Sequence, residues 1–228
     1  MLLALALACA TPPATDAYLD AALNGSPCGA IDDPALRGEC WSFSAQKVAA
    51  AGHVEQALAL CEQSTALWHD ECVFLVSDTV DSTFELADQL CNRANALRPQ
   101  CLGHASNREA RALLAEPGAE TAALARLAER TRAYRSPEMA RDEARRMVLQ
   151  RVADRRADQP FDVEICGDLS ADLCRDVYIE RLMRGGGADP KSGCDDPEIR
   201  QGLAPWTPPE LPLVQEAWTL LCTRGSGR

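Results

Sequence analysis

Apolar side chains recur at helical spacing along most of the chain, and strand-like alternation is nearly absent. Helix-capping signals agree, because Asp33-Pro34 and Ser136-Pro137 each place a capping residue before a proline in the first helical turn. The chain is therefore predicted to be all-α. The expected helices cover residues 34–51, 54–62, a segment through 72–76 that turns at 81–82, a segment through 84–91, then 98–114, 120–135, 137–157, 170–184 and 212–223.

Cysteine spacing adds a repeat to this helical pattern. Cys28 lies 12 residues before Cys40, Cys61 lies 11 before Cys72, and Cys91 lies 10 before Cys101. The second cysteines follow one another after 32 and 29 residues, which is the length of a two-helix unit. We expect disulfide-stapled antiparallel helical hairpins, stacked like a solenoid over residues 28–157. A smaller helical part with a Pro- and Gly-rich loop is expected over 158–228.

Two pairing schemes fit such hairpins. One joins cysteines within a hairpin, as in Cys40 to Cys61 and Cys72 to Cys91. The other joins sequential neighbours across the short connections, and we favour it because it uses all ten cysteines and the recurring spacing. Its pairs are Cys28–Cys40, Cys61–Cys72, Cys91–Cys101, Cys166–Cys174 and Cys194–Cys222.

The first residues predict export. A short apolar run, too short to span a bilayer, ends in Ala6-Leu7-Ala8-Cys9 and resembles the lipobox of a bacterial lipoprotein. We expect a signal segment over 1–9, lipidation of Cys9 and a tether over 10–27, with the protein anchored in the cell envelope. Plain secretion after cleavage behind Ala10 and a cytosolic location are the alternatives. An oxidising compartment agrees with ten cysteines that can all pair.

The composition argues against several classes of partner and of functional site. The formal charge of −11 argues against a nucleic-acid partner, because phosphates would repel the chain. The three histidines, His53, His69 and His104, are dispersed, and the chain contains no Cys-x-x-Cys pair and no phosphate-loop or dinucleotide motif. We therefore expect no metal and no cofactor. His53 is interpreted as a turn residue and His104 as a residue on a helix face.

Ten arginines lie between Arg126 and Arg156. Acidic residues are interleaved with them, and Asp142 and Arg146 have the spacing of a helical ion pair. A solvated helix face explains this segment better than a membrane or nucleic-acid surface.

Segment 28–115 resembles the cysteine-rich helical-repeat proteins that bacteria export, which are related in architecture to tetratricopeptide-like solenoids. The resemblance rests on Cys61, Cys91 and three similar helix starts, namely Glu39-Cys40, Glu71-Cys72 and Gln100-Cys101. Proteins of this kind mostly bind proteins or peptides. The resemblance therefore implies a non-enzymatic scaffold with a protein or peptide partner.

His69-Asp70-Glu71-Cys72 suggests a different function. Secreted calcium-dependent phospholipases carry His-Asp-x-Cys at the start of their active-site helix, where the histidine activates water and the aspartate binds calcium. A secreted hydrolase that uses His69 and Asp70 is therefore the alternative function. The repeat explains the motif better, because His69-Asp70 aligns with Arg37-Gly38 and Arg98-Pro99. On that interpretation His69 is an exposed residue at a helix start.

Overall fold

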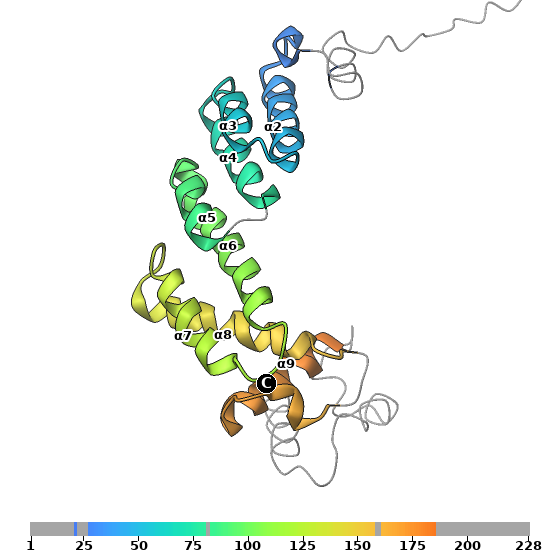
Figure 1. The fold of residues 1–228 in the computed structure, drawn as a ribbon, viewed down its shortest axis with the longest axis vertical. Helices are drawn as coiled ribbons and strands as arrows, with labels where there is room; N and C mark the ends of the chain where they lie inside the picture. The colour runs from blue at the N-terminus through green and yellow to red at the C-terminus, as the bar shows by residue number, and fades with distance from the viewer. Residues whose placement is uncertain (1–20, 22–26, 81–82, 158–160, 186–228) are drawn as a thin grey trace, which may run out of the picture. The chain divides into compact units, whose positions relative to one another are not determined.

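The computed structural model describes residue 21 and residues 27–80, 83–157 and 161–185, and all regular elements in these ranges are helical (Figure 1). The prediction of an all-α chain is confirmed. Cys9, Cys194, Cys222 and the helix expected over 212–223 lie outside the described residues. The α-helices are α2 (Pro34–Ala50), α3 (Val54–Cys61), α4 (Ala66–Thr79), α5 (Phe84–Cys91), α6 (Arg98–Leu113), α7 (Glu120–Thr131), α8 (Pro137–Asp154) and α9 (Ala171–Gly185).

The caps explain where several helices begin. The Asp33 carboxylate accepts hydrogen bonds from the backbone N–H groups of Ala35 and Leu36, and Pro34 stands in the first turn of α2. Ser136 caps α8 in the same way through the N–H of Met139. Between α2 and α3, Gly52 has a φ of 88°, a conformation that glycine adopts without steric cost. His53 follows it as the N-cap of α3, which confirms the turn predicted there.

The chain forms two compact units, residues 1–105 and 106–228, and the division falls within α6. The sequence places the boundary near residue 158 instead. The difference has a physical cause, since residues on both sides of 158 share one core. Phe161, Ile165 and Tyr178 are buried in the same apolar cluster as Leu127 and Val148.

In the first unit, α2 packs against both α3 and α4. The core between them is built of small and aliphatic side chains rather than aromatic rings, among them Ala45, Ala57, Leu58, Val73 and Val76. Small side chains allow helices to approach closely but bury little apolar area for each residue. Covalent links between neighbouring helices are therefore useful here.

Three disulfides supply those links in the first unit: Cys28–Cys40, Cys61–Cys72 and Cys91–Cys101. Their Cα–Cα distances are 5.7, 5.5 and 5.5 Å. A fourth, Cys166–Cys174, lies in the second unit. These four pairs are the ones that sequential pairing predicts, whereas Cys194–Cys222 lies outside the part of the chain that is described. The four disulfides fit an oxidising, exported environment.

Two disulfides of the first unit, Cys61–Cys72 and Cys91–Cys101, occupy equivalent places. Helices α3 and α5 each have 8 residues, share the pattern Glu-x-Ala-x-x-Leu-Cys and end at their cysteine. The partner cysteines Cys72 and Cys101 each stand at the seventh residue of the helical segment that follows, counted from Ala66 for α4 and from Asn95 for the 3₁₀ turn η2 (Asn95–Leu97) that leads into α6. Each link therefore joins the end of one short helix to the second turn of the next segment.

In the second unit, α7 and α8 form a helical hairpin, and α9 packs against α8 (Figure 1). The 3₁₀ turn η3 (Val163–Cys166) precedes α9 and is tied to it by Cys166–Cys174. Tyr178 of α9 packs edge-to-face on Phe161, with ring centroids 5.1 Å apart. Residues 161–166 are thus an anchored part of the core.

Candidate functional site

Asp70, the aspartate of the phospholipase-like motif, is buried near the start of α4. Its Oδ1 accepts a hydrogen bond of 2.8 Å from the side-chain amide of Asn95, and its Oδ2 accepts one of 3.0 Å from the backbone N–H of Ala96. Burial alone would raise the pKa of Asp70, but these hydrogen bonds and one from His69 outweigh it and lower the pKa below its ordinary value. The carboxylate thus caps η2, the turn that begins the next helical segment.

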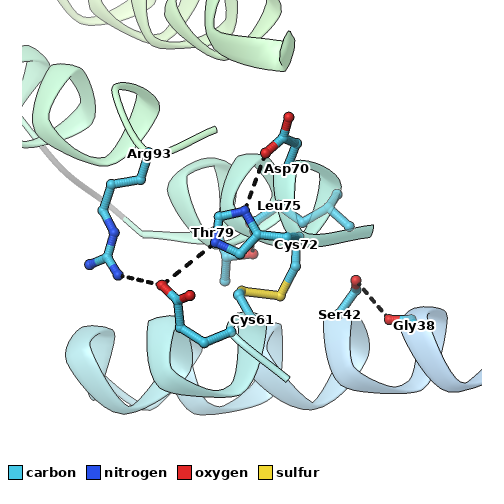
Figure 2. Close-up of a disulfide and its surroundings, with 10 residues drawn as sticks. Gly38, Ser42, Cys61, Asp70, Cys72, Leu75, Thr79 and Arg93 are labelled. Atoms are coloured by element: carbon cyan, nitrogen blue, oxygen red, sulfur yellow. Dashed lines mark hydrogen bonds and ion pairs between the residues drawn. A yellow bond between two sulfur atoms is a disulfide. The ribbon is translucent and has the colours of Figure 1, made fainter. Parts of the chain in front are cut away.

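His69 stands between two carboxylates. Its Nδ1 lies 3.2 Å from Oδ1 of Asp70, and its Nε2 lies 3.6 Å from Oε1 of Glu62. Glu62 also accepts a hydrogen bond of 3.0 Å from Arg93, which lowers its pKa more than any other contact. The network lies beside the Cys61–Cys72 disulfide, with Asp70 and Arg93 on different segments of the chain (Figure 2).

The His69 side chain is only 18% exposed, so its interpretation as an exposed residue at a helix start is wrong. Carboxylates lie against both ring nitrogens, Asp70 at Nδ1 and Glu62 at Nε2, and Glu62 is in turn paired with Arg93. Arg93, which pairs with Glu62, lies 24 positions after His69 in sequence.

The repeat explains why an aspartate occupies position 70. Gly38 and Asp70 both lie two residues before the second cysteine of a disulfide, and each faces the start of the segment that follows. At Gly38 the Trp68 ring fills this place so closely that a Cβ on residue 38 would collide with it. At Asp70 the next segment begins with a 3₁₀ turn, and the N–H of Ala96 needs an acceptor. At one repeat position, glycine leaves room for the Trp68 ring and aspartate accepts the N–H of Ala96. The residue type therefore depends on how the next helical segment begins.

The side chains of the His69-Asp70 motif already have partners within the chain. A general base needs one ring nitrogen directed at the proton it removes, and both nitrogens of His69 face carboxylates. Both carboxylate oxygens of Asp70 accept N–H groups, Oδ1 from Asn95 and Oδ2 from Ala96. In the described ranges, no three His, Cys, Asp or Glu side chains come together so that they could hold a metal ion.

We predict that Asp70→Ala lowers the free energy of unfolding of the first unit by about 1–3 kcal/mol, because it leaves two hydrogen-bond donors of the η2 start without their acceptor. His69→Ala is the matched control one residue away, and we expect it to cost less than about 1 kcal/mol. Urea unfolding of the oxidised full chain, followed by circular dichroism, measures both variants. Equal effects at the two positions would contradict the capping role of Asp70.

The second unit contains a groove that the sequence did not predict. It has a volume of about 780 Å³ and lies between α7, α8 and the start of α9. Its floor is apolar and formed by Leu124, Ala125, Ala128 and Leu173, while its rim carries the charged residues Arg132, Arg141, Asp142, Arg145 and Asp172 together with Thr121 and Ser170. Most rim side chains are exposed, so the groove is open to solvent.

Most of the arginines in this segment have acidic partners, in agreement with the interpretation as a solvated helix face. Arg126 pairs with Glu109, and Arg135 pairs with Glu143. Arg146 lies 3.9 Å from Glu143, a different partner from the Asp142 that the helical spacing suggests. Two groove arginines are paired as well, Arg132 with Glu129 at 3.8 Å and Arg145 with Asp176. Arg141 has no ion pair among the described residues.

Beside the groove, Glu120 and Arg155 form a buried ion pair that organises the second unit. The Glu120 side chain is fully buried and accepts hydrogen bonds from Arg155 and from the backbone N–H groups of Gly118 and Asp168. Arg155 also donates to backbone carbonyls of Leu114, Glu116 and Ile165. A Cβ on residue 167 would collide with the Glu120 carboxylate, and Gly167 has a φ of 59°. The pair thus joins three turns of this unit.

The same contacts set the charge of Glu120. Burial raises its pKa, but the N–H of Asp168 and the Arg155 guanidinium stabilise the carboxylate more strongly and lower the pKa from 4.5 to about 2. The only sequence signal was an acidic residue in the first turn of a predicted helix, where the helix dipole favours it. Its partner lies 35 residues away, so the ion pair itself could not be predicted.

His104, the remaining histidine, lies on an exposed helix face as predicted. Its Nδ1 is 3.2 Å from Asp78, and its ring meets the edge of Phe74. The partners of His104, Asp78 and Phe74, therefore differ from those of His69.

No described helix combines the length and the apolar content that crossing a bilayer requires. Comparison of the chain with protein-family models, with curated proteins and with solved structures gave no significant match. The function has to be inferred from the residues and their geometry.

Proposed function

We propose that the protein is a non-enzymatic helical scaffold that is anchored in the cell envelope and binds a protein or peptide partner. The observation that carries this proposal is the environment of Asp70, whose carboxylate holds the start of the next helical segment through Ala96 and Asn95. This role of Asp70 supports an architectural interpretation of the His69-Asp70 motif. The helices with their disulfides offer stable surfaces, and the groove of the second unit offers a place for a partner.

The anchor is the lipid on Cys9, and the following residues, rich in proline and threonine, hold the helical units away from the membrane. Replacing Cys9 with serine is expected to move the protein from the membrane fraction to the soluble or secreted fraction, because the lipid attachment site is lost. Fractionation and intact-mass measurement test this. A mature N-terminus at Thr11 without lipid would refute the anchor and leave export standing.

The partner can be sought by crosslinking cells that produce the tagged full chain, followed by mass spectrometry and reconstitution from purified proteins. The proposal expects a saturable complex of defined stoichiometry, and His69→Ala should bind as tightly as the wild type. The scaffold role fails if no protein is crosslinked more efficiently than to an unrelated lipid-anchored control.

A further inference from the structure

We propose that the groove between α7, α8 and the start of α9 binds an acidic amphipathic helix of a partner protein. This inference rests on the proposed scaffold role and names the chemistry of its partner. The apolar floor takes the leucine-like side chains of the bound helix, and the arginines of the rim take its carboxylates.

The floor of the groove supports an apolar contact. Three floor residues are half-buried and also pack against the core of the second unit: Leu124, Ala128 and Leu173. The floor is thus fixed in place before a ligand arrives, which reduces the ordering cost of binding. The groove volume of about 780 Å³ exceeds that of a single side chain, so the groove has room for several side chains from one face of a helix.

The arginines of the rim favour a ligand whose polar groups are carboxylates. Arg141 and Arg145 stand one helical turn apart on α8, and both line the groove. A helix lying along α8 presents glutamates at the same spacing of four residues. Guanidinium groups bind carboxylates through two parallel hydrogen bonds, and Arg141 has no ion pair among the described residues to compete with them.

The acidic residues on the rim leave an excess of positive charge. Asp172 is paired with Arg175 at 3.4 Å, outside the groove. Arg132 and Arg145 are likewise paired with residues outside the groove, Glu129 and Asp176. The groove lining itself carries three arginines and two aspartates, an excess of one positive charge in a chain whose formal charge is −11. The local excess of arginine favours an acidic ligand over a basic one.

The test uses the oxidised full chain and a fluorescein-labelled peptide made of two copies of Leu-Glu-Glu-Ala-Leu-Glu-Glu, with fluorescence anisotropy as the readout. The same peptide with lysine for glutamate is the control probe. We expect saturable binding of the acidic peptide and at least about tenfold weaker binding of the lysine peptide. Equal binding of both peptides, or binding of neither, would overturn the proposal.

Two pairs of variants locate the binding. Arg141→Glu should weaken binding of the acidic peptide at least about tenfold, whereas Arg111→Glu, the same charge change at an exposed position outside the groove, should leave it unchanged. Ala125→Glu should also weaken binding, and Ala122→Glu, one turn earlier on α7, should not. Equal losses within either pair would overturn the proposal.

Vesicles of phosphatidylglycerol test the competing ligand. If the vesicles bind the chain and Arg141→Glu abolishes that binding while the acidic peptide does not compete, the groove is a lipid site and the proposal is wrong. A partner found by crosslinking that contacts the chain away from the groove would leave the scaffold role intact and overturn this inference alone.

Discussion

Replacing Glu120 with glutamine is expected to lower the free energy of unfolding of the second unit by about 3–5 kcal/mol, because it leaves the charge of Arg155 uncompensated in the interior. The glutamine also turns an amide NH₂ toward the N–H groups of Gly118 and Asp168, which need acceptors. Hydrogen exchange of residues 106–185 in the full chain measures the loss within this unit.

Glu116→Gln is the matched control, since Glu116 is exposed and lies four positions before Glu120 in the sequence. It makes the same chemical change and is expected to shift stability by less than about 0.5 kcal/mol. Equal protection in the two variants would mean that the buried ion pair does not hold the unit together.

The depressed pKa of Glu120 also predicts a pH dependence. Its contribution to stability is fully present above the ordinary value of 4.5 and is lost as the pH falls through the folded-state value of about 2. The wild type should therefore lose stability between these two values, and Glu120→Gln should lack that part of the acid dependence. Urea unfolding at several pH values, compared with Glu116→Gln, tests the sign. A steeper acid loss in Glu120→Gln would contradict it.

Removing the Cys61–Cys72 disulfide by alanine at both positions is expected to destabilise the first unit by about 3 kcal/mol, in the entropic model for a loop of this length. The buried sulfur atoms also fill space between α3 and α4, which adds a packing loss. Cys72→Ala alone adds a free Cys61 thiol that can mispair, so it should give mixed disulfides on a non-reducing gel.

The double replacement of Cys166 and Cys174 is the matched control in the other unit. It should lower hydrogen-exchange protection after residue 106 and leave residues 28–105 as in the wild type. Loss of protection in both units from either double variant would contradict the division into independent units.

Local chemistry made much of the fold predictable. Asp33 and Ser136 cap helices as their sequence context indicates, and the spacing of the cysteines predicted which neighbours are joined. Both are short-range effects, since a cap acts within one turn and each disulfide closes a connection of 8 to 12 residues. The stacking of the hairpins into a solenoid stays a prediction.

The contacts that shape the candidate sites depend on distant residues. The role of Asp70 requires Ala96, and that of Glu120 requires Arg155, pairs for which the sequence carries no local signal. The groove requires the start of α9 beside α7 and α8, so its arginines look like an ordinary solvated face when read along the chain. The exposure expected for His69 was wrong because Glu62 and Asp70 flank its ring in the folded chain.

Fatty-acid release from phosphatidylglycerol vesicles in the presence of calcium tests the central claim most directly, with the purified, oxidised full chain and its His69→Ala variant side by side. The claim is that His69 and Asp70 serve the architecture and that the protein acts by binding. It predicts no calcium-dependent release above the protein-free control for either chain. Release by the wild type that His69→Ala abolishes, while the variant keeps its circular dichroism spectrum, would contradict it.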